Sequence, residues 1–421
     1  MFKKIPGTKD ILPEESYSWQ NLENIGRKIF SCYNYQEIRL PLIEEASLFD
    51  RTLGISSEIV QKQMFLVRHG KNLFALRPEG TAPIVRAYLE NNLDKTVKFI
   101  KLYYLGPMFR LERPQKGRLR QFHHLGCEVI GSTDPYVDVE IISLADNLLK
   151  NFSINGYEIK INSLGCKQDK ERWAEILRRQ LTPHANRLCA DCKVRIKKNV
   201  LRILDCKKPG CREMVRGLDL KKESYLCPDC LMHFGKVKEG LDLLKINYKV
   251  TPHLVRGLDY YTRTVFEITH TDLGSQDALG AGGRYDNLAQ ELGGPQIGAM
   301  GFAFGMERLL LVSRCKDINA SSKNLVYVIP LEEEAKKQAL RLLDNLRKQE
   351  ITADMDYENK SLKGAMRKAN DLGAKFVVII GEDELKKDVV TLKDMVLGQQ
   401  RQVKRQDLIL NIKKQISNRL I

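Results

Sequence analysis

The spacing of apolar residues changes several times along the chain and separates helical from extended segments. The first amphipathic stretch keeps a helical period up to Asn34, and its apolar face carries Leu22, Ile25, Ile29 and Phe30. Residues 35–40 then have the pattern of a strand, which Pro41 closes. The N-terminal region is therefore predicted to begin with a helix and to continue into a sheet.

Strand-like stretches with short connections follow. Residues 64–67 and 73–76 flank His69-Gly70-Lys71-Asn72, which is a hairpin signal. Three further strands are predicted at 98–105, 107–113 and 120–130, and the last two are joined by a turn at Pro114-Gln115-Lys116-Gly117. Consecutive strands joined by short turns favour an antiparallel sheet over βαβ units.

The pattern becomes helical from about residue 170 to 240. Cysteines cluster in this stretch, and between residues 181 and 240 there are 14 basic against 7 acidic residues. Strand and helix patterns then return, with a strand at 265–269, a glycine-rich stretch at 280–283 and a buried helix at 306–312. The 170–240 stretch is therefore predicted to be a mostly helical insertion into one larger domain, residues 1–320.

The pattern changes to alternating strands and helices after a linker at 317–324 that is rich in Ser, Asn and Lys. Strands are predicted at 325–329, 351–355 and 376–380, with helices at 332–348 and 361–372 between them. This alternation predicts a compact α/β domain with a largely parallel sheet, residues 325–421.

Composition and charge narrow the class of protein. The 421 residues include 43% hydrophobic and 29% charged residues, which are globular values. No apolar run approaches the ~20 residues that a membrane span needs, and residues 1–10 show no apolar signal segment, so we expect a cytosolic protein with no membrane partner and with reduced or metal-bound cysteines. The net charge of +16 favours a polyanionic partner.

The common phosphate-binding motifs are missing from the sequence. There is no GxxxxGK[ST], and Gly280-Ala281-Gly282-Gly283-Arg284-Tyr285 lacks the third glycine of a dinucleotide fingerprint. What remains is a strand-turn-strand with cations on both arms. On strands, Arg110 would share a face with Glu112, and Arg118 with Arg120. Two such arms predict a clamp for an oligophosphate; a solvated charged hairpin is the alternative.

Six stretches in chain order resemble a known family. Residues 106–128, GPMFRLERPQKGRLRQFHHLGCE, look like motif 2 of the class II aminoacyl-tRNA synthetases. Residues 35–41 are similar to motif 1, and residues 301–309, GFAFGMERL, to motif 3. The sequences LVRGLDYY at 254–261 and AGGRYD at 281–286 resemble the two signatures of histidyl-tRNA synthetases, and LRPEGT at 76–81 matches the amino-acid-binding strand end of that family.

The resemblance implies both a fold and a reaction. The fold would be α+β, an antiparallel class II catalytic sheet flanked by helices, with the helical insertion and a C-terminal α/β anticodon-binding domain. The reaction would use ATP and Mg²⁺ to convert L-histidine to histidyl-adenylate and then transfer it to tRNA(His). Motif 1 further implies a homodimer.

The resemblance also implies roles around the phosphates. Arg110 would hold the α-phosphate and the substrate carboxylate, and Arg256 would be the catalytic arginine at the α-phosphate. Arg308 would hold the γ-phosphate, while Glu112 and Arg118 belong to the loop that faces the nucleotide.

Histidine itself requires an acceptor and a donor across its ring. By resemblance, Glu128 and Tyr260 would read the imidazole, and Tyr261 would line the same pocket. The α-amino group would be bound at the LRPEGT strand end and beside His124, which stands where the family has glutamine. Together with Arg110 and Arg256, the implied histidine-binding set is Glu79, Gly80, Thr81, His124, Glu128, Tyr260 and Tyr261.

Two related functions are the alternatives. A synthetase-like regulatory subunit of ATP phosphoribosyltransferase has this fold but is expected to lack the C-terminal domain and intact signatures. A prolyl or threonyl enzyme would share the C-terminal domain, but LVRGLDYY argues against both.

The cysteines of the insertion suggest a metal. Two CxxC pairs, each able to supply two thiolates to Zn²⁺, give the predicted ligand set Cys189, Cys192, Cys227 and Cys230, with Cys206 and Cys211 as alternates. Reduced thiols in a packed helical segment are the other interpretation, because the synthetase family generally works without zinc and 34 residues separate the pairs.

Overall fold

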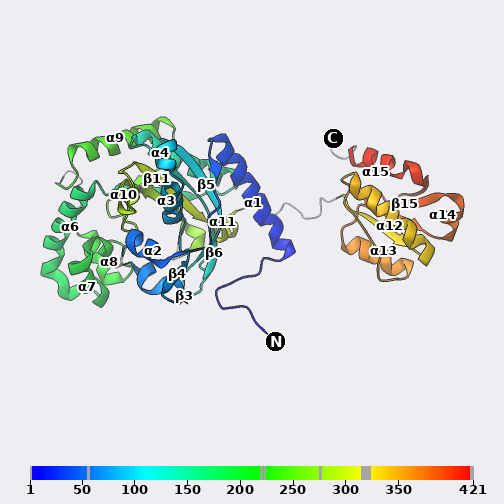
Figure 1. Ribbon diagram of the computed structural model, residues 1–421, viewed down its shortest axis with the longest axis horizontal. Coiled ribbons are helices and arrows are strands. Elements are labelled where there is room, and N and C mark those ends of the chain that lie inside the picture. Colours follow the sequence, from blue (N-terminus) through cyan, green and yellow to red (C-terminus); the bar gives the residue numbers. More distant parts are fainter. Residues whose placement is uncertain are drawn as a thin grey trace. The chain divides into compact units, whose positions relative to one another are not determined.

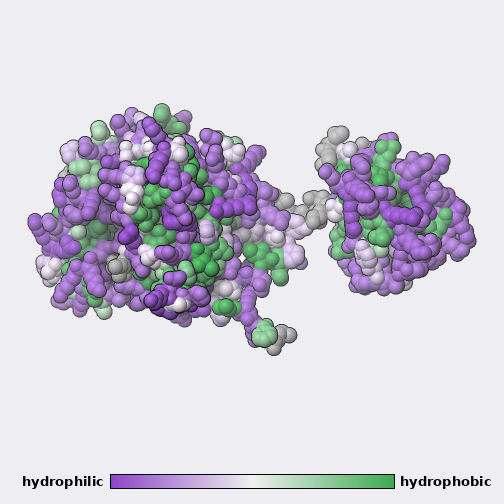
Figure 2. All heavy atoms as spheres, in the orientation of Figure 1, coloured by the Kyte–Doolittle hydropathy of each residue, from purple (hydrophilic) through white to green (hydrophobic). Residues whose placement is uncertain are grey.

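The computed structural model describes residues 2–54, 57–218, 221, 224–274, 277–313 and 324–417. The chain forms two compact units, residues 1–317 and 318–421 (Figure 1). Hydrophilic side chains dominate the visible face of each unit, and hydrophobic side chains gather near the middle of the visible face of the first (Figure 2). In the described residues, no helix is both long and apolar enough to span a membrane.

An eight-stranded sheet is the centre of the N-terminal unit. Its strand order is β1-β5-β6-β11-β10-β9-β7-β8, and all pairs are antiparallel except the two at the edges, β1 with β5 and β7 with β8. The strands are β1 (Gln36–Glu37), β5 (Ile100–Phe109), β6 (Gln121–Ile130), β7 (Tyr157–Ser163), β8 (Lys249–Val250), β9 (Thr262–His270), β10 (Ala278–Arg284) and β11 (Ala299–Gly305).

A separate three-stranded sheet contains the predicted hairpin. Strands β3 (Phe65–His69) and β4 (Asn72–Leu76) pair antiparallel, and β2 (Ile43–Glu45) joins β4. The two-residue connection contains Gly70 with φ +58°, a left-handed conformation that glycine adopts without a steric penalty. This confirms the hairpin expected from the sequence.

Helices cover both faces of the large sheet. Apolar residues of α1, α5 and α9 pack against one face, while α2, α3 and α10 lie in the cluster on the other. The helices are α1 (Pro13–Cys32), α2 (Ala46–Leu53), α3 (Thr81–Glu90), α4 (Leu93–Thr96), α5 (Pro135–Asn151), α6 (Lys167–Leu181), α7 (Ala190–Lys198), α8 (Pro209–Arg216), α9 (Pro228–Leu243), α10 (Leu288–Glu291) and α11 (Met306–Val312). Shorter turns are η1 (Ile59–Gln63), η2 (Thr182–Arg187), η3 (Val200–Ile203) and η5 (Thr271–Leu273).

Four of these helices, α6 to α9, follow one another between β7 and β8. The helical character predicted for residues 170–240 is therefore correct, and α11 has the predicted bounds. Two strand predictions were wrong. β1 is only two residues long, and β5 runs continuously through Gly106 and Pro107 instead of forming two strands.

The C-terminal unit contains a five-stranded sheet in the order β13-β12-β14-β15-β16. The first three are parallel, as predicted, but β15 and β16 are antiparallel additions that the sequence analysis did not identify. Apolar residues of α12 and α15 pack on one face and those of α13 on the other. The elements are β12 (Val326–Pro330), α12 (Glu333–Lys348), β13 (Ala353–Met355), α13 (Leu362–Asp371), β14 (Phe376–Ile380), α14 (Glu382–Lys387), β15 (Val389–Asp394), β16 (Gln400–Lys404), η8 (Arg405–Asp407) and α15 (Leu408–Ser417).

The α+β class predicted from the sequence is confirmed by this arrangement. Of the predicted linker, residues 317–323 lie outside the described residues.

Candidate functional site

A cavity of about 1100 Å³ opens in the N-terminal unit. Its wall includes the start of α3, the loop after β5, strand β6, the segment before β9, strands β9 to β11 and the start of α11. Strands β7 and β8, residues 204–207 and helix α8 also line it. The sequence-predicted residues that line it are Glu79, Gly80, Thr81, Arg110, Glu112, Arg118, His124, Arg256, Tyr260, Tyr261 and Arg308. The structure thus brings together residues that are more than 200 positions apart in the chain.

Alternation along β6 explains which of its side chains face the cavity. Leu125, Cys127 and Val129 belong to the apolar cluster on one face of the sheet. His124 and Glu128 therefore project from the opposite face, because successive residues of a strand alternate.

Glu128 lies behind the cavity wall with only 1% of its surface exposed. Its Oε1 accepts a hydrogen bond from Thr81 Oγ1 at 2.7 Å, and its Oε2 accepts one from Tyr285 Oη at 2.6 Å. The residue opposite it on β11 is Gly301, where an added Cβ would lie 1.6 Å from Glu128 Oε2. A glycine at 301 is therefore required by the position of this carboxyl group.

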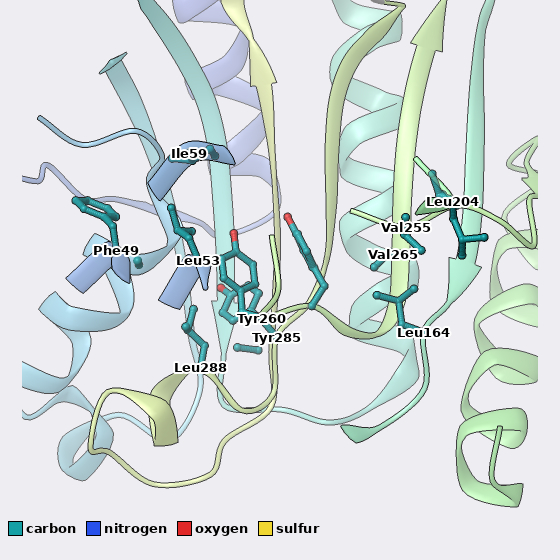
Figure 3. Close-up of a cluster of buried hydrophobic side chains, with 14 of the residues drawn as sticks. Phe49, Leu53, Ile59, Leu164, Leu204, Val255, Tyr260, Val265, Tyr285 and Leu288 are labelled. Carbon is teal, nitrogen blue, oxygen red and sulfur yellow. The ribbon is translucent and has the colours of Figure 1, made fainter. Parts of the chain in front are cut away.

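Burial dominates the protonation of Glu128. It raises the pKa of this carboxyl to about 8, even though the hydrogen bonds from Tyr285 and Thr81 lower it. Tyr260 packs edge-on against Tyr285 with ring centroids 5.7 Å apart, and Figure 3 shows both rings in the same buried cluster. The Glu128 carboxyl group beside the two tyrosines therefore gains or loses its proton near neutral pH.

Glu79 is held by the first turn of α3. The backbone N–H groups of Thr81 and Ala82 donate to its two carboxylate oxygens at 2.7 and 2.9 Å. Burial raises the pKa of Glu79, while these hydrogen bonds and the charge of Arg110 lower it, and the net shift is upward. This fixes a carboxyl group beside the cavity wall.

Three half-buried arginines are held by backbone carbonyls or by a carboxylate. Arg110 Nε donates to Pro78 O at 2.9 Å, and Arg308 donates to Gly117 O at 2.9 Å and Ala278 O at 2.6 Å. Arg256 Nη1 donates to Glu267 Oε2 at 2.5 Å. Burial lowers the pKa of Arg110 and of Arg308; repulsion from Arg256 adds to the lowering at Arg110, and repulsion from Arg110 adds to it at Arg308. An anion bound among these arginines would offset their repulsion and desolvation.

His124 faces the same positive cavity. Burial and the nearby Arg110 hold the pKa of its imidazole well below the usual value, so the ring is neutral. Its Nδ1 is buried and has no hydrogen-bond partner within the described part of the chain. A neutral ring with an unused nitrogen can accept or donate one hydrogen bond to a ligand.

The predicted strand-turn-strand clamp was wrong in one respect. β5 ends at Phe109 and β6 begins at Gln121, so Arg110 and Glu112 lie in the connecting loop and not on a strand face. The ladder stops because Leu111 N donates to Gln63 O at 2.7 Å. Arg118 forms an ion pair with Glu112 across the loop, whereas the Arg120 side chain donates to Pro6 O at 3.2 Å.

Sequence analysis missed three residues that shape the site, namely Glu267, Tyr285 as the partner of Glu128, and Tyr104. Glu267 could have been suspected because it is the one charged residue in the strand-like run 265–269. Tyr104 is opposite Gly126, and an added Cβ at Gly126 or Gly80 would lie 2.6 or 2.5 Å from its ring. Only the three-dimensional contact explains these two glycines.

The predicted set of four zinc ligands was also wrong as a single site. The structure divides the two CxxC pairs: Cys189 and Cys192 gather with the alternates Cys206 and Cys211, whereas Cys227 and Cys230 gather with Cys166 and Asp169. The reason is that each pair begins a different helix, α7 or α9, and each helix meets another partner segment.

Comparison with known proteins gives family matches over most of the chain. Residues 7–309 match the family model described as histidyl-tRNA synthetase, and residues 325–415 match an anticodon binding domain model. The histidine–tRNA ligase of Natranaerobius thermophilus is 45% identical over 408 residues, covering 96% of this chain and 97% of that protein. That of Halothermothrix orenii is 45% identical over 411 residues, covering 97% and 98%.

A solved structure agrees with the sequence relatives. The crystal structure of apo histidyl-tRNA synthetase from S. aureus has a TM-score of 0.82 and 34% identity, covering 98% of this chain and 100% of that chain. The family model alone covers more than half of the chain, and the relatives cover nearly all of it. The chain therefore belongs to the histidyl-tRNA synthetase family.

Proposed function

We propose that this chain ligates L-histidine to tRNA(His) in an ATP-dependent reaction with a histidyl-adenylate intermediate. The observation that carries the proposal is the buried Glu128, held by Thr81 and Tyr285, at a cavity whose wall contains Arg110, Arg256 and Arg308. The part around Glu128 suits a small polar ring, and the part that contains the three arginines suits an oligophosphate.

The histidine subsite would use carboxyl groups and neutral hydrogen-bonding groups. Glu128 would accept from an imidazole N–H, and Tyr260 Oη would donate to the other ring nitrogen. Glu79 and Thr81 would bind the α-ammonium group, with Gly80 between them leaving room for Tyr104. His124 Nδ1 is free to bond to the same end of the substrate, and Tyr261 lines the pocket.

The phosphate subsite would stabilise the activation step. The histidine carboxylate attacks the α-phosphorus in line, a new C–O–P linkage forms, and pyrophosphate leaves with the electrons of the broken P–O bond. Arg110 and Arg256 would stabilise the charge on the α-phosphate, and Arg308 that on the γ-phosphate. Glu112 and Arg118, paired with each other, would orient the loop over the nucleotide.

The cavity also suits Mg²⁺. This ion commonly binds through one or two carboxylates together with substrate phosphates. Glu112 and Glu267 line the cavity beside the arginines and offer such oxygens. When bound with ATP, Mg²⁺ would supply positive charge to the phosphates.

The partner that accepts the histidyl group would be tRNA(His). The match of residues 325–415 to an anticodon binding domain supports this assignment, as does the net charge of +16. The same match and the full set of cavity arginines favour the enzyme over a regulatory subunit of ATP phosphoribosyltransferase.

The functional unit is proposed to be a homodimer. β1 is an edge strand of the large sheet, and β2 and β3 beside it in sequence expose Ile43 and Leu66 with 52% and 51% of their surface accessible. Exposed apolar residues of this kind favour burial against a second copy. We expect light scattering at micromolar concentration to give twice the mass of the chain; a fully active monomer would contradict the proposal.

Pyrophosphate exchange with each of the twenty amino acids tests the activation step. Exchange should require histidine, because only its ring offers the donor and acceptor that Glu128 and Tyr260 would read. Exchange with proline or threonine would assign the chain to another synthetase, and exchange with none would favour the regulatory subunit.

A further inference from the structure

The helical segment between β7 and β8 holds seven of the ten cysteines of the chain, and the structure gathers all seven into two groups. We call them the four-thiol group and the mixed group. The ligand atoms of each group lie within 4.8 Å of one another. The four-thiol group is Cys189, Cys192, Cys206 and Cys211; the mixed group is Cys166, Asp169, Cys227 and Cys230.

The spacing of the sulfur atoms fits a shared metal. In the four-thiol group, Cys189 Sγ and Cys206 Sγ are 3.9 Å apart. Four sulfurs arranged tetrahedrally around Zn²⁺ at about 2.3 Å have edges of roughly 3.8 Å. All cysteines among the described residues are free thiols, so the groups are not held by disulfides.

The backbone around the four-thiol group favours thiolates. Cys189 immediately precedes α7, and Cys211 lies in the first turn of α8, so two helix N-termini approach the group. The backbone N–H of Cys189 also donates to Cys211 Sγ at 3.3 Å. Donors of this kind stabilise the deprotonated sulfur that zinc requires.

The mixed group has a carboxylate in place of the fourth thiol. Asp169 is fully buried; its oxygens accept the backbone N–H groups of Cys166 at 3.2 Å and Cys227 at 3.1 Å, and Oδ1 also forms an ion pair with Arg172. These two cysteines precede α6 and α9, so the carboxylate is fixed where the two helices begin. Zinc binds carboxylate oxygens as well as thiolates, so Asp169 can serve as the fourth ligand beside three cysteines.

We propose that this segment binds two structural Zn²⁺ ions, one in the four-thiol group and one in the mixed group. Each group offers four protein ligands, which is the closed coordination of a structural site. The proposal uses every cysteine of the segment and does not depend on the enzymatic activity. Seven cysteines that only fill an apolar core would have no need to gather as a group of four and a group of three around a carboxylate.

The two zinc sites would stabilise the loop that carries Arg256 and Tyr260. Between Cys192 and Cys206 lie Asn199 and Arg202, which both donate to Asp259 Oδ1 of that loop, at 3.1 and 3.0 Å. Leu204 of the same stretch shares an apolar cluster with Val255 (Figure 3). A metal in the four-thiol group would fix both ends of the stretch.

The mixed group reaches the same loop from α6. Lys170, the neighbour of Asp169, donates through Nζ to Asp259 O and Tyr261 O, both at 2.9 Å. Metal binding in this segment would therefore stabilise the loop from two directions.

Elemental analysis of untagged full-length protein, purified from zinc-supplied cells without chelators, tests the proposal. We expect two zinc ions per chain. Cys211→Ser and Cys230→Ser should each lower the value to about one, because each removes a ligand from a different group. Cys32→Ser is the matched control, since Cys32 is exposed and belongs to neither group, and it should retain two ions.

A second measurement uses wild-type protein, so that the proposal can be tested even if the cysteine variants do not fold. Wild-type protein loaded with Co²⁺ should show the visible absorption of tetrahedral cobalt and thiolate-to-metal charge transfer, and a strong chelator should lower its Tm. Folded wild-type protein with well below one zinc per chain, no such spectrum and an unchanged Tm would overturn the proposal. If the wild type holds one ion per chain and only one of the two variants loses it, the proposal is overturned for the group whose variant retains the ion.

Discussion

Glu128 is a residue of the candidate site whose ionisation depends strongly on the fold. Its pKa of about 8 is above the usual 4.5, because burial disfavours the charged carboxylate. A raised folded-state pKa stabilises the protein fully below the unfolded value, and this contribution is lost as the pH rises from about 4.5 to about 8. The limiting slope is about 1.4 kcal/mol per pH unit.

The variant Glu128→Gln isolates this effect because glutamine does not ionise. We expect the Tm of the wild type, relative to the variant, to fall steadily between pH 5 and pH 8 in scanning calorimetry without ligands. A difference in Tm that stays constant over this range would show that Glu128 does not carry a raised pKa.

Arg256 is the arginine that we place at the reacting phosphate. Arg256→Ala should lower the rate of histidine-dependent pyrophosphate exchange by about 10²-fold or more, because one lost contact to developing charge costs about 3 kcal/mol. Circular dichroism should show an unchanged fold. Exchange at the wild-type rate would remove Arg256 from the mechanism.

A matched control is Arg86→Ala. Arg86 is also half-buried and paired with a carboxylate, Glu44, but it does not line the cavity. Its replacement should affect stability and leave the exchange rate within about twofold, as for residues that act only through packing.

Among the elements, η3 is one of those that connect the helical segment to the site. Arg202 of η3 donates to Gly257 O at 3.3 Å and to Asp259 Oδ1 at 3.0 Å. Arg202→Ala should raise the KM for histidine by roughly fivefold with a smaller change in kcat, since one such bond is worth about 1 kcal/mol.

The control for this positioning role is Arg178→Ala. Arg178 donates to Ile196 O at 3.3 Å, inside the helical segment, and does not line the cavity. It should leave both constants unchanged. An equal loss of kcat in the two variants would indicate a general weakening of the segment.

The sequence predicted an element correctly where neighbouring residues determine its conformation. The turn at Gly70 and the helix Met306–Val312 depend on neighbouring residues and appear as expected. β5 continues through Pro107 because β1 pairs with β5 only at Leu102 and Tyr103, so the missing N–H breaks no ladder there. Residues beyond β1 leave the sheet, and Arg77 donates to Leu40 O and Pro41 O.

In the candidate site, too, features encoded by neighbouring residues could be predicted, whereas contacts between distant segments could not. Motif resemblance supplied the cavity-lining residues to which we assign roles in binding histidine and ATP, because each signature is contiguous in the chain. It could not supply Glu267 as the partner of Arg256, or the grouping of Cys227 with Asp169, because these contacts depend on how strands and helices meet.

At the scale of the whole molecule, the two compact units have separate cores. A chain that ends at residue 320 should retain histidine-dependent pyrophosphate exchange, because every proposed site residue precedes that point. Its charging of tRNA(His) should fall by at least tenfold, since the match to an anticodon binding domain is lost. Normal charging by the truncated chain would give residues 325–421 another role.

The formation of histidyl-tRNA by the purified full-length chain tests the central proposal most directly. The chain would be incubated with ATP, Mg²⁺, labelled histidine and total tRNA, and the charged species identified by hybridisation. We predict label on tRNA(His) alone and none when ATP is omitted. Label on other tRNAs, or no acylated tRNA from folded protein that binds ATP and histidine, would contradict the account.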